Sequence, residues 1–165
     1  KQKAHYDGIQ DCVAAAKVAG KGPMTCEFGC LGFGTCLKAC KYGALSLKNG
    51  HAFIDADRCV GCMSCVAVCP RHVITPVPYE ADIVVACNSH AKGVAVTKGC
   101  SIGCLGCGKC EKICPNDAIH VVDNLAQIDY SKCVSCGLCA EHCPRHLISD
   151  ANLRQDMDLA EARAR

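Results

Sequence analysis

The chain has 165 residues, of which 19 are cysteine, and only 4% are aromatic, with no tryptophan. A chain of this length forms one or two small domains, and neither could bury a large apolar core unaided. The formal net charge is only +2, and we expect no nucleic-acid partner. The composition therefore indicates a scaffold that its cysteines hold together through cross-links or bound metal.

Disulfides, zinc and iron–sulfur clusters are the three chemistries that could use so many cysteines. Disulfides predict an even count with scattered spacings behind a signal peptide. Here the count is odd, the spacings are short and repeated, and the first residues, KQKAHYDGIQ, contain no apolar signal segment. We therefore expect reduced cysteines in a cytoplasmic setting. No stretch approaches the ~18 uninterrupted apolar residues that span a bilayer, so we expect a soluble chain.

An internal repeat of 74 residues organises the chain between residues 26 and 146. The string CPRH recurs at 69–72 and 143–146, and the register never slips. Cysteines coincide in the pairs Cys26/Cys100, Cys30/Cys104, Cys36/Cys110, Cys40/Cys114, Cys59/Cys133, Cys62/Cys136, Cys65/Cys139 and Cys69/Cys143. The two stretches are therefore copies of one module.

The first half of the chain begins with an N-terminal segment, 1–23, in which Ile9–Ala19 predicts a short helix ended by Gly20. The first module follows at 24–76. Between its cysteine groups, the strands Ala44–Leu47 and Ala52–Ile54 flank the turn signal Asn49-Gly50 and predict a hairpin.

The second half begins with a linker, 77–98, since the string TPVPYEAD contains two prolines. Within this linker Ile83–Ala86 predicts a short strand. The second module, 99–149, repeats the hairpin with strands Ala118–Val122 and Leu125–Ile128 around Asp123-Asn124. A solvated tail, 150–165, ends the chain. Short helical turns are expected after the third cysteine of each group, at Leu37–Ala39, Val66–Val68, Glu111–Ile113 and Ala140–His142.

The cysteine spacing favours iron–sulfur clusters over zinc. Residues 59–70 and 133–144 both read C-x2-C-x2-C-x3-C-P, the bacterial ferredoxin run in which the fourth thiolate reaches the neighbouring cluster. Zinc usually takes C-x2-C pairs that are separated by a dozen or more residues. With its partner run at 104–115, the second module predicts one [4Fe-4S] cluster on Cys104, Cys107, Cys110 and Cys143, and another on Cys133, Cys136, Cys139 and Cys114.

The first module lacks one regular ligand, because Phe33 stands where the second copy has Cys107. Phenylalanine cannot bind iron, and Cys26, ahead of Cys30, offers a substitute in the spacing C-x3-C-x5-C-x3-C. We therefore predict clusters on Cys26, Cys30, Cys36 and Cys69, and on Cys59, Cys62, Cys65 and Cys40. The alternative is a single intact cluster in this module.

Three cysteines remain after these sixteen are assigned. Cys100 is a possible replacement for Cys107, although the regular spacing favours Cys107. Cys12 and Cys87 are interpreted as buried free thiols that behave as small hydrophobes. The expected fold class is α+β, with two tandem bacterial-type two-cluster [4Fe-4S] ferredoxin modules that are rich in loops, short hairpins and short helices.

Four clusters and no catalytic pair of side chains predict an electron relay rather than an enzyme site. Each oxidised cluster with its four thiolates adds about −2, so the loaded chain should carry a charge of about −6. That charge is low for a free carrier of this type. Four lysines lie inside the cluster loops, and we expect them to form a docking face for an acidic ferredoxin: Lys38, Lys41, Lys109 and Lys112.

The chain resembles the B subunit of the Rnf complex, an ion-translocating ferredoxin:NAD oxidoreductase. The likeness rests on YDGIQDCVAAAKVAGKGPMTCEFGCLGFGTCLKAC, the Cys59 run, ACNSHAKG at 86–93, GCSIGCLGCGKCEKICP and DNLAQIDYSKCVSCGLCAEHCP. It covers the chain to about residue 149. Lys41 departs from the Pro that many relatives carry after the fourth cysteine.

The resemblance implies an electron-transfer subunit of a translocase complex. Such a subunit takes electrons from reduced ferredoxin and passes them to membrane partners toward NAD, coupled to Na⁺ or H⁺ transport. It implies a peripheral domain on the cytoplasmic side of the cell membrane, held by an upstream anchor that this sequence does not contain. Two alternatives stay open: a polyferredoxin or electron-transfer subunit of a soluble oxidoreductase, and a structural zinc-binding module.

Overall fold

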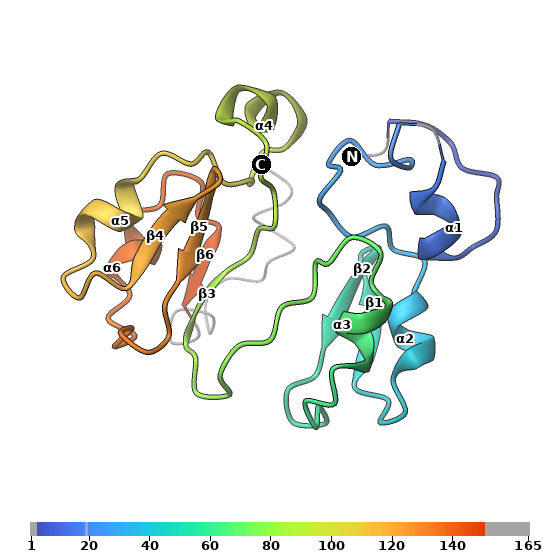
Figure 1. The fold of residues 1–165 in the computed structure, drawn as a ribbon, viewed down its shortest axis with the longest axis horizontal. Helices are drawn as coiled ribbons and strands as arrows, with labels where there is room; N and C mark the ends of the chain where they lie inside the picture. Colours follow the sequence, from blue (N-terminus) through green and yellow to red (C-terminus); the bar gives the residue numbers. More distant parts are fainter. Residues whose placement is uncertain (1–2, 19, 151–165) are drawn as a thin grey trace. The chain divides into compact units, whose positions relative to one another are not determined.

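The computed structural model describes residues 3–18 and 20–150, and it divides the chain into two compact units, Lys1–Tyr79 and Glu80–Arg165 (Figure 1). All of the predicted tail 150–165 except its first residue lies outside the described residues. Within the described ranges, no helix has the length and apolar character that a membrane crossing requires. Helices and strands are short, and most of the backbone is loop, as the ferredoxin-like fold class predicts.

The first unit joins short helices to a two-stranded hairpin. Its elements are α1 (Cys12–Ala16), α2 (Thr35–Ala39), β1 (Leu45–Lys48), β2 (His51–Ile54) and α3 (Ser64–Val68). Strands β1 and β2 pair antiparallel. The turn between them places Asn49 at φ 49° and Gly50 at φ 73°. Two consecutive left-handed residues form the turn whose twist matches that of paired strands, so the Asn-Gly signal predicts this hairpin correctly.

Helix α1 is shorter than the predicted Ile9–Ala19. It begins at Cys12 because Asp11 is its N-cap: the Asp11 carboxylate accepts hydrogen bonds from the amides of Val13, at 2.8 Å, and Ala14, at 3.1 Å. An aspartate in this position has extended backbone and satisfies amides that the first turn leaves unpaired. The cap therefore fixes the start of the helix three residues later than the apolar pattern suggests.

The second unit repeats this arrangement and adds a second small sheet. Its elements are β3 (Ile83–Val85), α4 (Gly93–Gly99), α5 (Lys109–Ile113), β4 (Ile119–Val122), β5 (Leu125–Ile128), α6 (Leu138–Glu141) and β6 (Ile148–Asp150). Strands β4 and β5 form the hairpin, and β3 pairs antiparallel with β6. The predicted strand at 83–86 is thus present, whereas no pattern in the sequence indicated α4.

The 74-residue offset between the two sequence repeats also relates helices and strands of the two units. Helix α5 begins and ends 74 residues after α2, and the same shift relates β4 to β1 and β5 to β2. Each of the helices α2, α3, α5 and α6 follows a residue with left-handed backbone, at Gly34, Met63, Gly108 and Gly137. A left-handed residue reverses the chain sharply, so the cysteine loop ahead of each helix folds back onto its first turn.

The larger apolar core belongs to the second unit. It surrounds the fully buried side chains of Ile83 on β3 and Ile119 on β4, and three cysteines, Cys104, Cys110 and Cys143, are buried in it. The described part of the first unit has a smaller cluster, in which Cys12 and Ala15 of α1 pack with Leu31. Cysteine side chains therefore belong to the buried core of both units.

Candidate iron–sulfur sites

A pocket in the second unit is ringed by four cysteines. Cys114, Cys133, Cys136 and Cys139 line it together with apolar side chains that include Ile83, Ile119 and Leu138. The chain brings them together because α5, which ends just before Cys114, packs against α6, which carries Cys139. These are the four residues that the spacing assigns to one cluster.

The other predicted set of the second unit lies in its core. Cys104, Cys110 and Cys143 are buried within one apolar cluster, while Cys107 is exposed. Two backbone amides of this unit point at the sulfur of a predicted ligand: Gly106 donates to Cys104 Sγ at 3.5 Å, and Ala118 donates to Cys114 Sγ at 3.3 Å. Amide donors of this kind stabilise thiolates and the sulfur atoms of a cluster.

The first unit also has a pocket that is lined by four cysteines, but these four cysteines differ from the predicted ligand set. It is lined by Cys30, Cys36 and Cys69, as predicted, and by Cys12. Cys26 is not among its lining residues. The remaining set is more open, since Cys59 and Cys62 are exposed and Cys65 and Cys40 are half-buried.

Burial raises the pKa of several cysteines in these predicted ligand sets. Desolvation is the main cause that raises the pKa of Cys110 and of Cys139 to about 11. It also raises the pKa of Cys36 and of Cys65 above the usual value of 9.0. Such thiols stay protonated at neutral pH, so a bound cation must displace the proton before they can act as ligands.

The donor sets fit iron–sulfur clusters. All nineteen cysteines lie in the described part of the chain, and no disulfide joins any two of them. Among the described residues, no group of three or more His, Cys, Asp or Glu side chains converges as a single bound ion requires. A cluster of four irons separates its thiolates more widely than one ion does, so a ring of four sulfurs around a pocket suits it.

Two arginines that sequence reasoning missed support the loops beside these sites. Arg71 Nη1 donates to the carbonyl of Cys26 at 2.8 Å and of Gly29 at 3.4 Å, and its Nη2 donates to the Lys21 carbonyl. Arg145 Nη2 donates to the carbonyl of Cys100, the repeat equivalent of Cys26. The signal that could have identified both arginines is the recurrence of CPRH at the 74-residue spacing.

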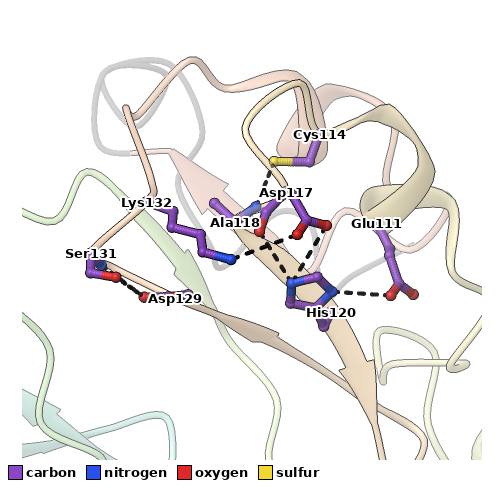
Figure 2. Close-up of polar contacts among 8 residues, drawn as sticks. All are labelled: Glu111, Cys114, Asp117, Ala118, His120, Asp129, Ser131 and Lys132. Atoms are coloured by element: carbon purple, nitrogen blue, oxygen red, sulfur yellow. Dashed lines mark hydrogen bonds and ion pairs between the residues drawn. The ribbon is translucent and has the colours of Figure 1, made fainter.

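A network of charged side chains joins Glu111, His120, Asp117 and Lys132 in the second unit, as Figure 2 shows. His120 Nδ1 lies 3.2 Å from Glu111 Oε1, and its Nε2 lies 3.7 Å from Asp117 Oδ1. Lys132 pairs with the other oxygen of Asp117 at 3.6 Å. The hydrogen bond with Glu111, more than the charge of Asp117, raises the pKa of His120 above 6.5.

The four lysines of the predicted docking face are exposed. Lys38 lies on α2 and Lys41 follows that helix, while Lys109 and Lys112 lie on α5. Within the described residues, none of the four is joined to a carboxylate by an ion pair of 4.0 Å or less. Their charges are thus available at the surface beside cysteine loops in both units.

Comparison with known protein families gives three overlapping matches, each described as a 4Fe-4S dicluster domain. They cover residues 25–74, 58–119 and 103–147. The first and third of these ranges correspond to the two copies of the repeat. The middle range joins the end of one copy to the beginning of the next. Multiple [4Fe-4S] clusters are therefore the cofactors of this chain.

Three curated relatives are similar over most of the chain. The B subunit of the proton-translocating ferredoxin:NAD(+) oxidoreductase complex of Clostridium ljungdahlii is 50% identical over 127 residues, which are 76% of this chain and 44% of the relative. The Na(+)-translocating counterpart from Acetobacterium woodii is 41% identical over 131 residues, 79% of this chain and 39% of the relative. The B subunit of the ion-translocating oxidoreductase complex of Methanosarcina acetivorans is 42% identical over 130 residues, which are 77% of this chain and 48% of the relative.

The matched part spans less than half the length of each of these relatives. The match extends over 127 to 131 residues of this chain, which is longer than one 74-residue copy of the repeat. The chain is accordingly a homologue of the Rnf complex B subunit and is built from 4Fe-4S dicluster domains.

Proposed function

We propose that this chain is an electron-transfer subunit that relays low-potential electrons from reduced ferredoxin, through four [4Fe-4S] clusters, to the membrane partners of an Rnf-type complex. In that complex the electrons reduce NAD, and their passage drives transport of Na⁺ or H⁺. The observation that carries the proposal is the ring of Cys114, Cys133, Cys136 and Cys139 around one pocket. The 74-residue repeat extends the same chemistry to both units.

The proposed layout is two tandem two-cluster ferredoxin modules, 24–76 and 99–149. The second module uses Cys104, Cys107, Cys110 and Cys143 for one cluster and the ringed set for the other. The first uses Cys59, Cys62, Cys65 and Cys40 for one cluster. Its other cluster takes Cys30, Cys36 and Cys69 with one further thiolate, for which the spacing offers Cys26.

The side chains of the protein bind the clusters and tune their surroundings. When bound, [4Fe-4S] clusters supply one-electron redox centres. Apolar side chains such as Ile83 and Ile119 line the pocket and reduce its access to water, and the amides of Gly106 and Ala118 donate to the sulfurs of Cys104 and Cys114. Such hydrogen bonds and solvent exclusion are the means by which a protein sets cluster potential.

A cytoplasmic position beside the membrane follows from the proposed partners, since a soluble ferredoxin must reach the chain. The exposed lysines supply a charge complement for such a donor: Lys38, Lys41, Lys109 and Lys112. Opposite charges on the two proteins would accelerate their encounter, and salt would weaken that effect.

Two experiments test the function. The first quantifies iron and sulfide in the purified, anaerobically handled chain, where four clusters predict about sixteen atoms of each. A brown chain with this content excludes the zinc-binding alternative, and a colourless chain with bound zinc would refute the proposal. A polyferredoxin of a soluble oxidoreductase would be favoured instead if the full-length gene lacked a membrane anchor.

The second experiment replaces all four lysines with glutamate and measures electron uptake from reduced ferredoxin. We expect a fall of about tenfold or more at low salt, and a rate that no longer declines as salt is added. Reversal of four exposed lysines outside the cysteine runs, Lys17, Lys48, Lys92 and Lys98, changes the net charge equally and is the matched control. A quadruple variant with the wild-type rate and salt dependence would eliminate the docking face.

A further inference from the structure

The missing cysteine at Phe33 leaves one cluster of the first unit short of a ligand, and the structure presents a thiol that the spacing did not indicate. Cys12 lines the pocket with Cys30, Cys36 and Cys69. The pocket of the second unit is an internal reference, because its ring of four cysteines coincides with one orthodox ligand set. By that standard, the four cysteines that line the first pocket, Cys12 among them, are the candidates for its ligand set.

Cys12 is fixed in the pocket by contacts that tie α1 to α2. The backbone amide of Cys12 donates to Thr35 Oγ1 at 2.8 Å, and the Thr35 hydroxyl donates to Asp11 Oδ2 at 2.8 Å. Thr35 begins α2 and immediately precedes Cys36. The N-cap of one helix and the first residue of the next are therefore joined, and this contact places Cys12 near Cys36, which the spacing predicts as a cluster ligand.

The residue that replaced the regular ligand packs onto the same helix. Phe33 lies against the buried cluster of Cys12, Ala15 and Leu31. Its ring centroid is 5.2 Å from that of Tyr6, just upstream of α1. The phenylalanine that removed one thiol thus contributes to the packing that holds another thiol at the pocket.

Cys26 occupies a different environment, and it shares that environment with Cys100. Its carbonyl accepts the hydrogen bond from Arg71, as the carbonyl of Cys100 accepts one from Arg145. The second unit has a full ligand set without Cys100, because Cys107 is present. Cys26 and Cys100 are equivalent in the repeat and in their arginine contact, so the regular spacing that favours Cys107 over Cys100 also argues against Cys26 as a ligand.

We propose that Cys12, rather than Cys26, is the fourth ligand of the first-unit cluster that Cys30, Cys36 and Cys69 bind. The proposal rests on the four-cluster function proposed above. On loading, the Cys12 thiol loses its proton to solvent and the thiolate binds iron. This ligand lies outside the matched dicluster domain, which begins at residue 25, so the N-terminal segment becomes part of the cofactor site.

The test compares Cys12→Ser, Cys26→Ser and the double variant Cys12→Ser/Phe33→Cys in the full chain, reconstituted anaerobically. Iron and sulfide per chain are measured, and EPR of the oxidised protein reports [3Fe-4S] centres. Cys12→Ser should lose between about one and four iron atoms and, where a partial cluster survives, show a [3Fe-4S] signal. Cys26→Ser should keep the wild-type iron content.

The double variant separates ligation from folding. Phe33→Cys restores the regular C-x2-C-x2-C spacing, so it should return the iron content of Cys12→Ser to the wild-type value and remove the [3Fe-4S] signal. Loss of iron in Cys26→Ser with retention in Cys12→Ser would overturn the proposal, as would a Cys12→Ser deficit that Phe33→Cys does not repair. A wild-type chain without four clusters would be a failure of the proposed function, which is a distinct result.

Discussion

The two units carry the same cysteine framework on the same elements, but they differ in what packs around it. In the second unit the strands β3 and β6 add a small sheet to the hairpin, and Ile83 joins a core that buries three cysteines. The described part of the first unit instead uses α1 and its smaller cluster around Cys12. The comparison shows that cysteine spacing is retained while each unit closes its cluster sites with different neighbours.

The polar surroundings of the hairpins differ in the same way. Glu111 and His120 form an ion pair in the second unit, whereas the 74-residue register places Leu37 and Ser46 at these positions in the first. Conversely, Thr35 holds Asp11 and Cys12 in the first unit, and its counterpart in the second is the exposed Lys109. Each unit therefore has a polar contact of its own next to α2 or α5.

The strongest test of the correspondence between the two repeat copies is a pair of single variants in the second unit, each of which replaces one cysteine. We expect Cys107→Ser to lose between about one and four iron atoms, because this residue completes a regular run, and Cys100→Ser to lose none. Metal analysis and EPR provide the measurement. If Cys100→Ser alone loses iron, Cys100 replaces Cys107, and the equivalence of Cys26 and Cys100 would then favour Cys26 as a ligand.

Two glycines that are equivalent in the repeat, Gly32 and Gly106, should differ in how much their substitution lowers stability, with the larger loss in the first unit. Gly32 has φ 81°, and a Cβ there would lie 2.5 Å from the Gly50 carbonyl oxygen; at Gly106, with φ 64°, the corresponding distance to Asn124 is 3.1 Å. We expect Gly32→Ala to cost about 1–3 kcal/mol or more and Gly106→Ala to cost less. Thermal bleaching of the cluster absorbance ranks the two variants, and equal midpoints would contradict the structure.

The two arginines that are equivalent in the repeat, Arg71 and Arg145, should show a smaller difference in their effects on stability. Arg71 donates to three carbonyls and Arg145 to that of Cys100. Hydrogen bonds from a charged donor contribute about 1.5–3 kcal/mol each when they are protected from water. We expect Arg71→Ala to bleach at a lower temperature than Arg145→Ala, and lysine to rescue neither fully because it lacks the forked geometry.

The smallest expected effect is a pH dependence of stability that arises from the Glu111–His120 pair of the second unit. The hydrogen bond with Glu111 raises the pKa of His120 above 6.5, so its stabilising contribution is complete below pH 6.5. It is lost as the pH rises through the raised folded-state pKa. The bleaching midpoint should therefore fall slightly more between about pH 6 and 8 in wild type than in Glu111→Gln. Identical pH profiles would show that the pair does not stabilise the fold.

The hairpins and a short helix near the third cysteine of each group could be predicted because local signals specify them, although each helix begins one residue before that cysteine rather than after it. Asn49-Gly50 dictates a tight turn, and the turn at Asp123-Asn124 has the same left-handed pair, at φ 47° and 63°. Helix α4 and the pairing of β3 with β6 could not be predicted. The latter joins residues more than sixty positions apart, and no local pattern encodes such a partner.

The sequence by itself determined the chemistry: the C-x2-C-x2-C-x3-C runs specify iron–sulfur ligands because the tight loop alone aims successive sulfurs at one cluster. It also determined the repeat, since identical spacings at a fixed offset need no structure to be recognised. Only the tertiary structure decided which cysteines share a pocket. Cys12 lies eighteen residues before Cys30 in the chain, and a capped helix, a threonine hydroxyl and the packing of Phe33 bring it to the ring. Spacing describes ligands that one loop presents, whereas a ligand delivered from another element depends on packing.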